Sequence, residues 1–209
     1  PTGSAGQLGA THSQSFESWF ANCPGLKVIV PSTPYDCKGL LKSAIRDNDP
    51  VIFMESEQMY ADKGEVPEGE YLLPIGVADV KRKGTDVTIV SFGKIIKIAF
   101  EAADILAKEG ISCEIIDLRT VRPIDYATVI ESVKKTNRLV CLEEAWPLGS
   151  IATEITYKVQ QEAFDYLDAP IKRITTLDTP APYSPTLLKV WLPQLEQVLD
   201  AVKSVMYIK

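Results

Sequence analysis

The sequence predicts an α/β fold with a short first part and a longer second part, each built on parallel strands covered by helices. Apolar runs of strand length alternate with stretches of helical periodicity along most of the chain. A strand followed by a crossover helix and a second strand implies parallel pairing of the two strands. With 209 residues, of which 45% are hydrophobic and 24% charged, the chain has the composition of an ordinary globular protein.

The first part, residues 1–60, contains one strand–helix–strand unit. Residues 26–31 read as a buried strand, Pro34 begins a helix, and residues 51–54 form the next strand. The apolar positions of the helix recur at helical spacing, at Cys37, Leu40, Leu41, Ala44 and Ile45. Because such a sheet averages about five strands, we expect this part to be the closing half of a domain whose opening half precedes Pro1. Its open edge would then be covered by another chain or by crystal or dimer contacts.

Residues 61–85 are polar and interrupted by glycine and proline, and we interpret them as a linker. Residues 86–209 are then expected to form a complete α/β domain. Its strands are predicted at 87–92, 113–118, 138–142 and 171–175. Its helices are predicted at 95–110, after the capping residue Asp125, at 151–167, and from Pro193 to Val205. A proline-rich turn at 178–183 separates the last strand from the last helix.

The acidic balance of the chain argues against a nucleic-acid partner. The chain has 28 acidic and 22 basic side chains, whereas binding to a phosphate backbone needs clustered Lys and Arg. No apolar run approaches the roughly 18 residues of a membrane-spanning helix, so no membrane partner is expected. The four cysteines form no C-x-x-C pair, which predicts neither a zinc site nor a disulfide framework. We interpret the protein as cytoplasmic or from an equivalent reducing compartment.

The only histidine, His12, lies in a glycine-rich opening segment and is the strongest candidate for a functional residue. Imidazole ionises near neutral pH, so a histidine held on a short loop can donate or accept a proton where charge develops. A lone histidine is also common as a loop or capping residue bonded to backbone. The residues alone leave both interpretations open.

Arg119 and Arg122 flank a predicted strand end in an otherwise acidic chain. Their guanidinium groups could bind a carboxylate across a subunit interface. They could equally pair within the chain, with acids such as Asp117. The sequence favours neither alternative.

Several motifs, in order over the whole chain, resemble the β subunits of the thiamine-diphosphate-dependent 2-oxo acid dehydrogenases. These motifs are residues 1–14, 24–28, 38–47, 117–123, 143–147 and 178–183. Residues 55–60 are more similar to the pyruvate branch of the family than to the branched-chain branch. Ala145 stands where the family usually has glycine in its Glu-Glu-Gly-Trp-Pro motif.

The resemblance implies an amino-terminally truncated pyrimidine-binding domain in residues 1–60 and a complete transketolase C-terminal-like domain in residues 86–209. It implies oxidative decarboxylation of pyruvate, with acyl transfer to lipoamide. Thiamine diphosphate would lie between this subunit and an α subunit that holds the diphosphate and magnesium. The family's cofactor-activating glutamate falls before Pro1, so the piece alone is expected to be inactive. The family's active-site histidine falls on His12, which favours the catalytic interpretation of that residue.

The resemblance also implies a potassium ion bound by backbone carbonyls at the end of the helix in the first part. The matching positions are Ala44, Ile45, Asp47 and Asp49. The last carbonyls of a helix lack intrahelical partners and carry the negative end of its dipole, so they suit a cation. Hydration of an ordinary helix end is the alternative.

By the same resemblance, the partners are an α subunit, a second β subunit and a lipoyl acyltransferase core. The compartment would be the bacterial cytoplasm, or the mitochondrial matrix in a eukaryote. Arg119, Arg122 and Lys209 are the candidate interface residues. The alternatives are a non-catalytic dimerisation or assembly module, or the β subunit of a branched-chain 2-oxo acid or acetoin dehydrogenase.

Overall fold

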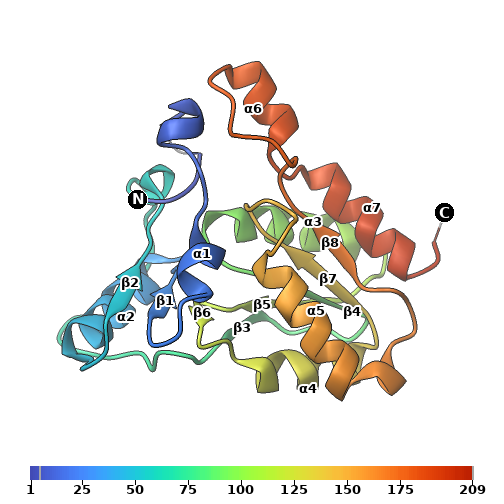
Figure 1. Cartoon of the computed structure of the whole chain (residues 1–209). Helices are drawn as coiled ribbons and strands as arrows, with labels where there is room; N and C mark the ends of the chain where they lie inside the picture. The colour runs from blue at the N-terminus through green and yellow to red at the C-terminus, as the bar shows by residue number, and fades with distance from the viewer. Residues whose placement is uncertain (5, 209) are drawn as a thin grey trace.

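Strand β1 (Lys27–Ile29) of the first part has a partner strand on each side. Strand β2 (Val51–Phe53) pairs with it in parallel, and α2 (Pro34–Arg46) makes the connection between them. Helix α2 begins at Pro34 because the side chain of Thr33 accepts a hydrogen bond from the backbone N–H of Asp36. The computed structural model describes residues 1–4 and 6–208, and it confirms the predicted strand–helix–strand unit (Figure 1).

The second partner of β1 is β6 (Thr120–Arg122), which belongs to the second part of the chain and runs antiparallel to β1. The backbone N–H of Val30 extends this pairing with a 2.8 Å bond to the carbonyl of Arg119. We expected another chain to cover the open sheet, but this chain covers one edge of β1 itself. The sequence did not reveal β6 because three residues with one arginine and no apolar periodicity carry no strand signal.

The second part contains a five-stranded sheet in the order β3-β5-β4-β7-β8. Strands β4 (Val87–Ser91), β5 (Cys113–Asp117), β7 (Leu139–Leu142) and β8 (Lys172–Ile174) are parallel, as predicted. Strand β3 (Asp79–Arg82) lies within the segment interpreted as a linker and pairs antiparallel with β5. It is polar and half-buried at the edge of the sheet, so its sequence resembles a loop.

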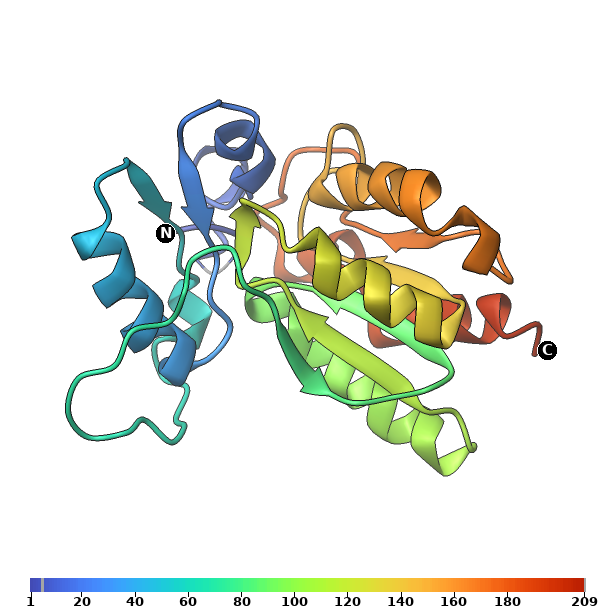
Figure 2. The ribbon, with the colours of Figure 1, turned by 90° about the horizontal axis from the view of Figure 1, so that it is seen from below.

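Helices cover both faces of this sheet (Figure 2). The apolar cores place α3 (Ile96–Lys108) and α7 (Leu195–Val205) on one face, and α4 (Tyr126–Thr136) and α5 (Ile151–Glu162) on the other. Helix α5 ends earlier than predicted, and the 3-10 turn Phe164–Tyr166 follows it. Helix α7 begins after Pro193, with a capping box between Gln194 and Gln197. The seven-residue helix α6 (Pro185–Trp191) is too short to show a periodic pattern.

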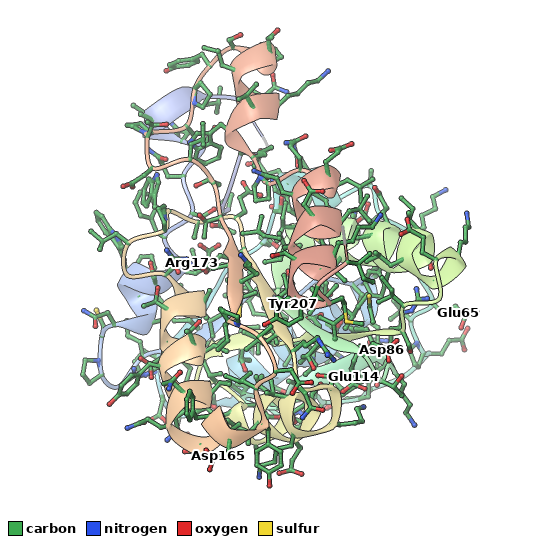
Figure 3. All side chains as sticks on the ribbon, turned by 90° about the vertical axis from the view of Figure 1, so that its right-hand side faces the viewer. Glu65, Asp86, Glu114, Asp165, Arg173 and Tyr207 are labelled. Atoms are coloured by element: carbon green, nitrogen blue, oxygen red, sulfur yellow. The ribbon has the colours of Figure 1, made fainter. Side chains whose placement is uncertain are left out.

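Two charged side chains of the second part that Figure 3 labels, Glu114 and Arg173, are bonded within the chain. Glu114 on β5 is 2% exposed, accepts a 2.5 Å hydrogen bond from the hydroxyl of Ser132 and forms an ion pair with Lys135. Arg173 on β8 donates a 2.7 Å hydrogen bond to the hydroxyl of Thr153 on α5. No helix in the described part of the chain has the length and apolar character needed to cross a membrane.

The two parts share one hydrophobic core. Val28, Val30 and Met54 of the first part belong to the same buried cluster as Phe92 and Leu118 of the second part. All five side chains are less than 9% exposed. Burial of apolar surface across the junction therefore stabilises the arrangement of the two parts as well as each part alone.

A buried ionic network also crosses the junction. Asp36 at the start of α2 is fully buried, with ion pairs of 2.7 Å to Lys81 on β3 and 3.2 Å to Arg119 before β6. The Arg119 guanidinium also donates to the carbonyls of Val77 and Ala78. Arg119 has a positive φ of 57°, which is an uncommon conformation for a residue with a side chain. These contacts stabilise that conformation.

We expect Arg119→Met to lower the free energy of unfolding by about 3 kcal/mol, because it leaves Asp36 with one of its two cationic partners in a buried site. Arg82→Met is the matched control, since the Arg82–Asp104 ion pair is exposed and such pairs contribute less than about 1 kcal/mol. Urea unfolding at neutral pH measures both changes. Equal losses in the two variants would contradict the importance assigned to the buried network.

Candidate functional site

His12 lies on a loop, Gly3–Gln14, that closes on itself. We name this segment, of which Ala5 is not described, the His12 loop. The backbone N–H of Gly3 donates to the carbonyl of Gln14 at 3.1 Å and so joins the two ends. Inside the loop, the 3-10 turn η1 (Gly9–Thr11) precedes His12, and the buried hydroxyl of Ser13 accepts from the N–H of Leu8 at 2.8 Å. The loop therefore has an internal framework of its own.

The imidazole of His12 is exposed and makes no hydrogen bond with the described residues. Its backbone N–H bonds to the carbonyl of Gly9 at 3.4 Å. Gly9 has a φ of 69°, which glycine adopts without strain. An accessible imidazole on a braced backbone is suited to exchanging a proton with a molecule bound beside it.

The base of the His12 loop is attached to the second part by two charged residues. The backbone N–H of Ser4 donates to Oε1 of Glu144 at 2.8 Å, and Lys94 Nζ donates to the Ser4 hydroxyl at 2.8 Å. Lys94 and Glu144 form an ion pair of 3.0 Å. A Cβ atom at Gly3 would lie 2.9 Å from Glu144 Oε1, so only glycine allows this close approach.

The far side of the His12 loop contacts the proline-rich segment 178–183. The N–H of Ala181 donates to the side-chain carbonyl of Gln14 at 3.2 Å. A Cβ at Gly9 would lie 2.3 Å from the ring of Tyr183, so the ring lies directly against the loop backbone. In Figure 1 the loop accordingly rises beside α6.

Two tryptophans hold the proline-rich segment in place. The indole N–H groups of Trp146 and Trp191 both donate to the carbonyl of Thr179, at 3.0 and 2.8 Å. Trp146 also contacts Phe16, just after the His12 loop, with ring centroids 5.7 Å apart. The second part therefore contacts the loop at several points from a well-anchored surface.

A small cavity with several polar groups in its lining lies beneath the base of the loop. Its volume is about 20 Å³, which is room for one water molecule, and its lining includes Thr2, Glu17, Ser56, Lys94 and Glu144. Oε1 of Glu17 accepts a 2.7 Å hydrogen bond from the Thr2 hydroxyl. Oε2 of Glu17 and the hydroxyl of Ser56 have no hydrogen-bond partner among the described residues. The cavity therefore contains polar groups that a water molecule could bond.

Burial raises the pKa of Glu17 to about 7, and the nearby Glu144 and Glu143 carboxylates add to the shift. Glu143 is also buried, and burial raises its pKa to about 7 although the N–H of Ala152 at the start of α5 donates to it. Glu17 and Glu143 therefore both have a pKa close to neutral pH. The contacts of Glu17, Lys94 and Glu144 with Thr2 and Ser4 have no local sequence signal, because the contacting residues are far apart in the chain.

The residues proposed to bind potassium lie elsewhere, at the carboxyl end of α2. The carbonyl of Ala44 accepts from the N–H of Asp47 at 3.3 Å, and the side chain of Ile45 is 74% exposed. Lys27 Nζ lies 2.7 Å from the carboxylate of Asp47 and 3.0 Å from that of Asp49. The two carboxylates thus have a cationic partner within the chain.

The three predicted interface residues have different environments. Arg119 is 6% exposed and its guanidinium bonds within the chain, as the intrachain alternative predicts, although with Asp36 rather than with the side chain of Asp117. Arg122 is half-buried and donates to the carbonyl of Ala21 at 3.0 Å. It lines an open groove between α1 (Glu17–Ala21) and the start of α5. Lys209 lies outside the described residues.

Comparison with known proteins agrees with the two-part architecture. Residues 76–198 match the family model described as the C-terminal domain of transketolase, and residues 1–63 match the model described as its pyrimidine-binding domain. A split-gene transketolase solved as an inactive β4 tetramer has a similar fold, with a TM-score of 0.81 at 24% identity. That similarity covers 100% of this chain and 65% of the other.

The curated relatives include pyruvate dehydrogenase E1 component β subunits. That of Rhizobium meliloti is 53% identical over 99% of this chain and 45% of its own length, and the mitochondrial β-2 subunit of Oryza sativa subsp. japonica is 48% identical over 99% and 56%. The β subunit of acetoin:2,6-dichlorophenolindophenol oxidoreductase from Cupriavidus necator is 50% identical over 98% and 60%. The chain thus spans about half the length of the curated relatives it matches.

We expect the stability of the protein to fall as the pH rises through 7, in part because of Glu17. Its pKa is about 7 in the folded protein and 4.5 ordinarily, so the folded state holds its proton more tightly. This contribution is fully present below pH 4.5 and is lost as the pH rises through the folded pKa. Glu17→Gln cannot ionise, so its free energy of unfolding relative to that of the native protein should increase by roughly 2.5 kcal/mol from pH 5 to pH 8.

Urea unfolding across this pH range measures the difference, with Glu101→Gln on the exposed surface of α3 as the matched control. The control should follow the native pH profile. A Glu17→Gln profile parallel to that of the native protein would contradict the raised pKa.

Proposed function

The chain belongs to the transketolase family, and on that premise we propose that it is part of the β subunit of a thiamine-diphosphate-dependent 2-oxo acid dehydrogenase acting on pyruvate. The observation that carries this proposal is the exposed imidazole of His12 on a loop braced by contacts from the second part of the chain. The identity to bacterial and plant pyruvate dehydrogenase β subunits over nearly the whole chain supports the choice of reaction.

In this proposal His12 exchanges a proton at an imidazole nitrogen while the acyl group passes to lipoamide. Thiamine diphosphate, when bound, supplies the electron sink for decarboxylation of the 2-oxo acid. This chain fits thiamine diphosphate because His12 is accessible and the backbone around it is fixed. A proton donor must meet its acceptor at hydrogen-bond distance. The glycines of the loop let the backbone adopt its close contacts with Glu144 and Tyr183.

We assign residues 1–60 to the cofactor side and residues 86–209 to assembly, with residues 61–85 between them. The proposed partners are an α subunit that holds the diphosphate and magnesium, a second β subunit, and a lipoyl acyltransferase core. Arg122 beside the open groove is the remaining described candidate for a subunit contact. The compartment is the cytoplasm in a bacterium or the mitochondrial matrix in a eukaryote.

A second candidate function is acetoin oxidation, because the acetoin-type relative is about as similar to this chain as the pyruvate-type relatives. The two functions differ in substrate and share the same fold. Rates with pyruvate, branched-chain 2-oxo acids and acetoin, measured on the full-length protein assembled with its α subunit, distinguish them. A preference for acetoin over pyruvate would replace the leading proposal.

We propose that the carbonyl oxygens at Ala44, Ile45, Asp47 and Asp49 bind potassium, with the ion relying on backbone dipoles because the carboxylates of Asp47 and Asp49 already pair with Lys27. Potassium chloride should then raise the melting temperature by a few degrees relative to choline chloride at equal ionic strength. Asp47→Asn, which keeps the backbone carbonyl, should retain the effect. The same melting temperature in both salts would refute the site.

The central test is His12→Ala in the full-length protein assembled with its α subunit. Acyl transfer to lipoamide should fall by about 100-fold, the size expected for the loss of a positioned acid or base, while the circular dichroism spectrum stays unchanged. Thr11→Ala, which alters an exposed neighbour on the same loop, should retain native activity. Native rates for His12→Ala would show that the histidine is only a loop residue.

A further inference from the structure

We propose that Lys94 and Glu144 are positioning residues that fix the His12 loop from the second part of the chain, so that this part contributes directly to catalysis. This inference rests on the proposed function of His12. The proposed chemistry belongs to the first part. The inference adds a role for two residues of the second part.

The Lys94–Glu144 pair makes direct contact with the beginning of the loop. Glu144 Oε1 accepts the backbone N–H of Ser4 at 2.8 Å, and Lys94 Nζ donates to the Ser4 hydroxyl at 2.8 Å. The same ammonium lies 3.0 Å from Glu144 Oε2 and donates to Oε1 of Gln58 at 2.9 Å. Lys94 and Glu144 therefore each bond to Ser4 of the loop and also pair with each other.

Both charged groups are largely removed from solvent. The Lys94 side chain is 11% exposed and that of Glu144 is 6% exposed. Charge-assisted hydrogen bonds in such surroundings are stronger and less easily replaced by water than those on an open surface. Removal of either group therefore costs the loop a strong contact at Ser4.

The backbone around Lys94 is also fixed. Lys94 lies in the 3-10 turn η3 (Gly93–Ile95) that follows β4, and Gly93 has a φ of 61°. A Cβ on Gly93 would lie 3.1 Å from the side chain of Val30, so this turn packs against the first part. Lys94 is thus presented to the loop from a rigid strand end, as accurate positioning requires.

The loop is attached on both sides of His12. The Lys94–Glu144 pair holds it at Ser4, whereas the segment 178–183 contacts it at Gly9 and Gln14. All three contacts come from the second part. A displacement of about 1 Å can cost about 100-fold in rate when it moves a group that must meet a bound molecule. Release of the loop at Ser4 would therefore displace the imidazole of His12.

The alternative is that the ion pair only holds the two parts together. Lys97 on α3 offers a control for this alternative, because it forms a more exposed ion pair of 2.5 Å with Asp62, just beyond the end of the first part. Lys97 does not contact the described residues of the His12 loop. Loss of either pair weakens the junction, whereas only loss of the Lys94–Glu144 pair releases the loop.

The test compares Lys94→Met, Lys94→Arg and Lys97→Met in the full-length protein assembled with its α subunit. For Lys94→Met, kcat for acyl transfer to lipoamide should fall by about 10-fold with KM for pyruvate unchanged within about twofold. Lys94→Arg should recover most of this loss, and Lys97→Met should keep the native kcat. A native kcat for Lys94→Met, or equal losses for Lys94→Met and Lys97→Met, would overturn the proposal.

A double variant shows whether Lys94 acts through His12. If it does, His12→Ala/Lys94→Met should be no slower than His12→Ala alone, because a displaced loop no longer matters once the imidazole is gone. A further 10-fold loss in the double variant would overturn the proposal. Backbone hydrogen exchange of residues 6–14 should increase in Lys94→Met and stay native in Lys97→Met, and unchanged exchange in both would also overturn it.

These measurements separate the two hypotheses. Native activity of His12→Ala refutes the proposed function, and this inference with it. Reduced activity of His12→Ala together with native activity of Lys94→Met refutes only the positioning role. If Lys94→Met does not assemble, Ser4→Ala removes the same loop contact with a smaller change. We then expect about a threefold loss in kcat and faster exchange in the loop, and native values of both would overturn the proposal.

Discussion

The arrangement of the whole chain depends on β1, a three-residue strand that hydrogen-bonds to its own part through β2 and to the second part through β6. Beside it, the buried carboxylate of Asp36 binds Lys81 and Arg119 from the second part. Strand pairing has a defined register, and a buried charge requires its partner, so both contacts specify one relative position of the two parts. The contacts of the His12 loop with the second part require that position.

Polar groups are concentrated where the two parts meet, which is unusual for a shared core. The apolar cluster around Val28 and Leu118 supplies burial but little directional preference. The Lys94–Glu144 pair and the Asp36 network have preferred distances and angles. Each loses much of its interaction energy if its charged groups are displaced. The junction therefore combines nondirectional stabilisation with directional contacts, and the directional contacts lie beside the residue that needs accurate placement.

The same burial makes the junction responsive to pH. Burial raises the pKa of Glu17 on α1 and of Asp117 at the end of β5 to about 7. The Asp117 carboxylate accepts a hydrogen bond from the Ser32 hydroxyl, which offsets part of the cost of burying its charge. Ionisation of either group near neutral pH places negative charge in the region that holds the two parts together.

The sequence alone determined the elements whose signals are local and periodic, such as α2, α3 and α7 with their apolar stripes, the apolar strands β4, β5 and β7, and His12 as the candidate functional residue. Tertiary structure alone decided the positions of β3 and β6, whose short polar sequences become strands only because neighbouring edges need partners. It also decided the surroundings of His12. Ser4 lies 140 residues from Glu144 and 90 residues from Lys94, and no pattern in the sequence encodes such a contact. Periodicity reports how one segment faces a core, whereas pairing between distant side chains depends on how the whole chain packs.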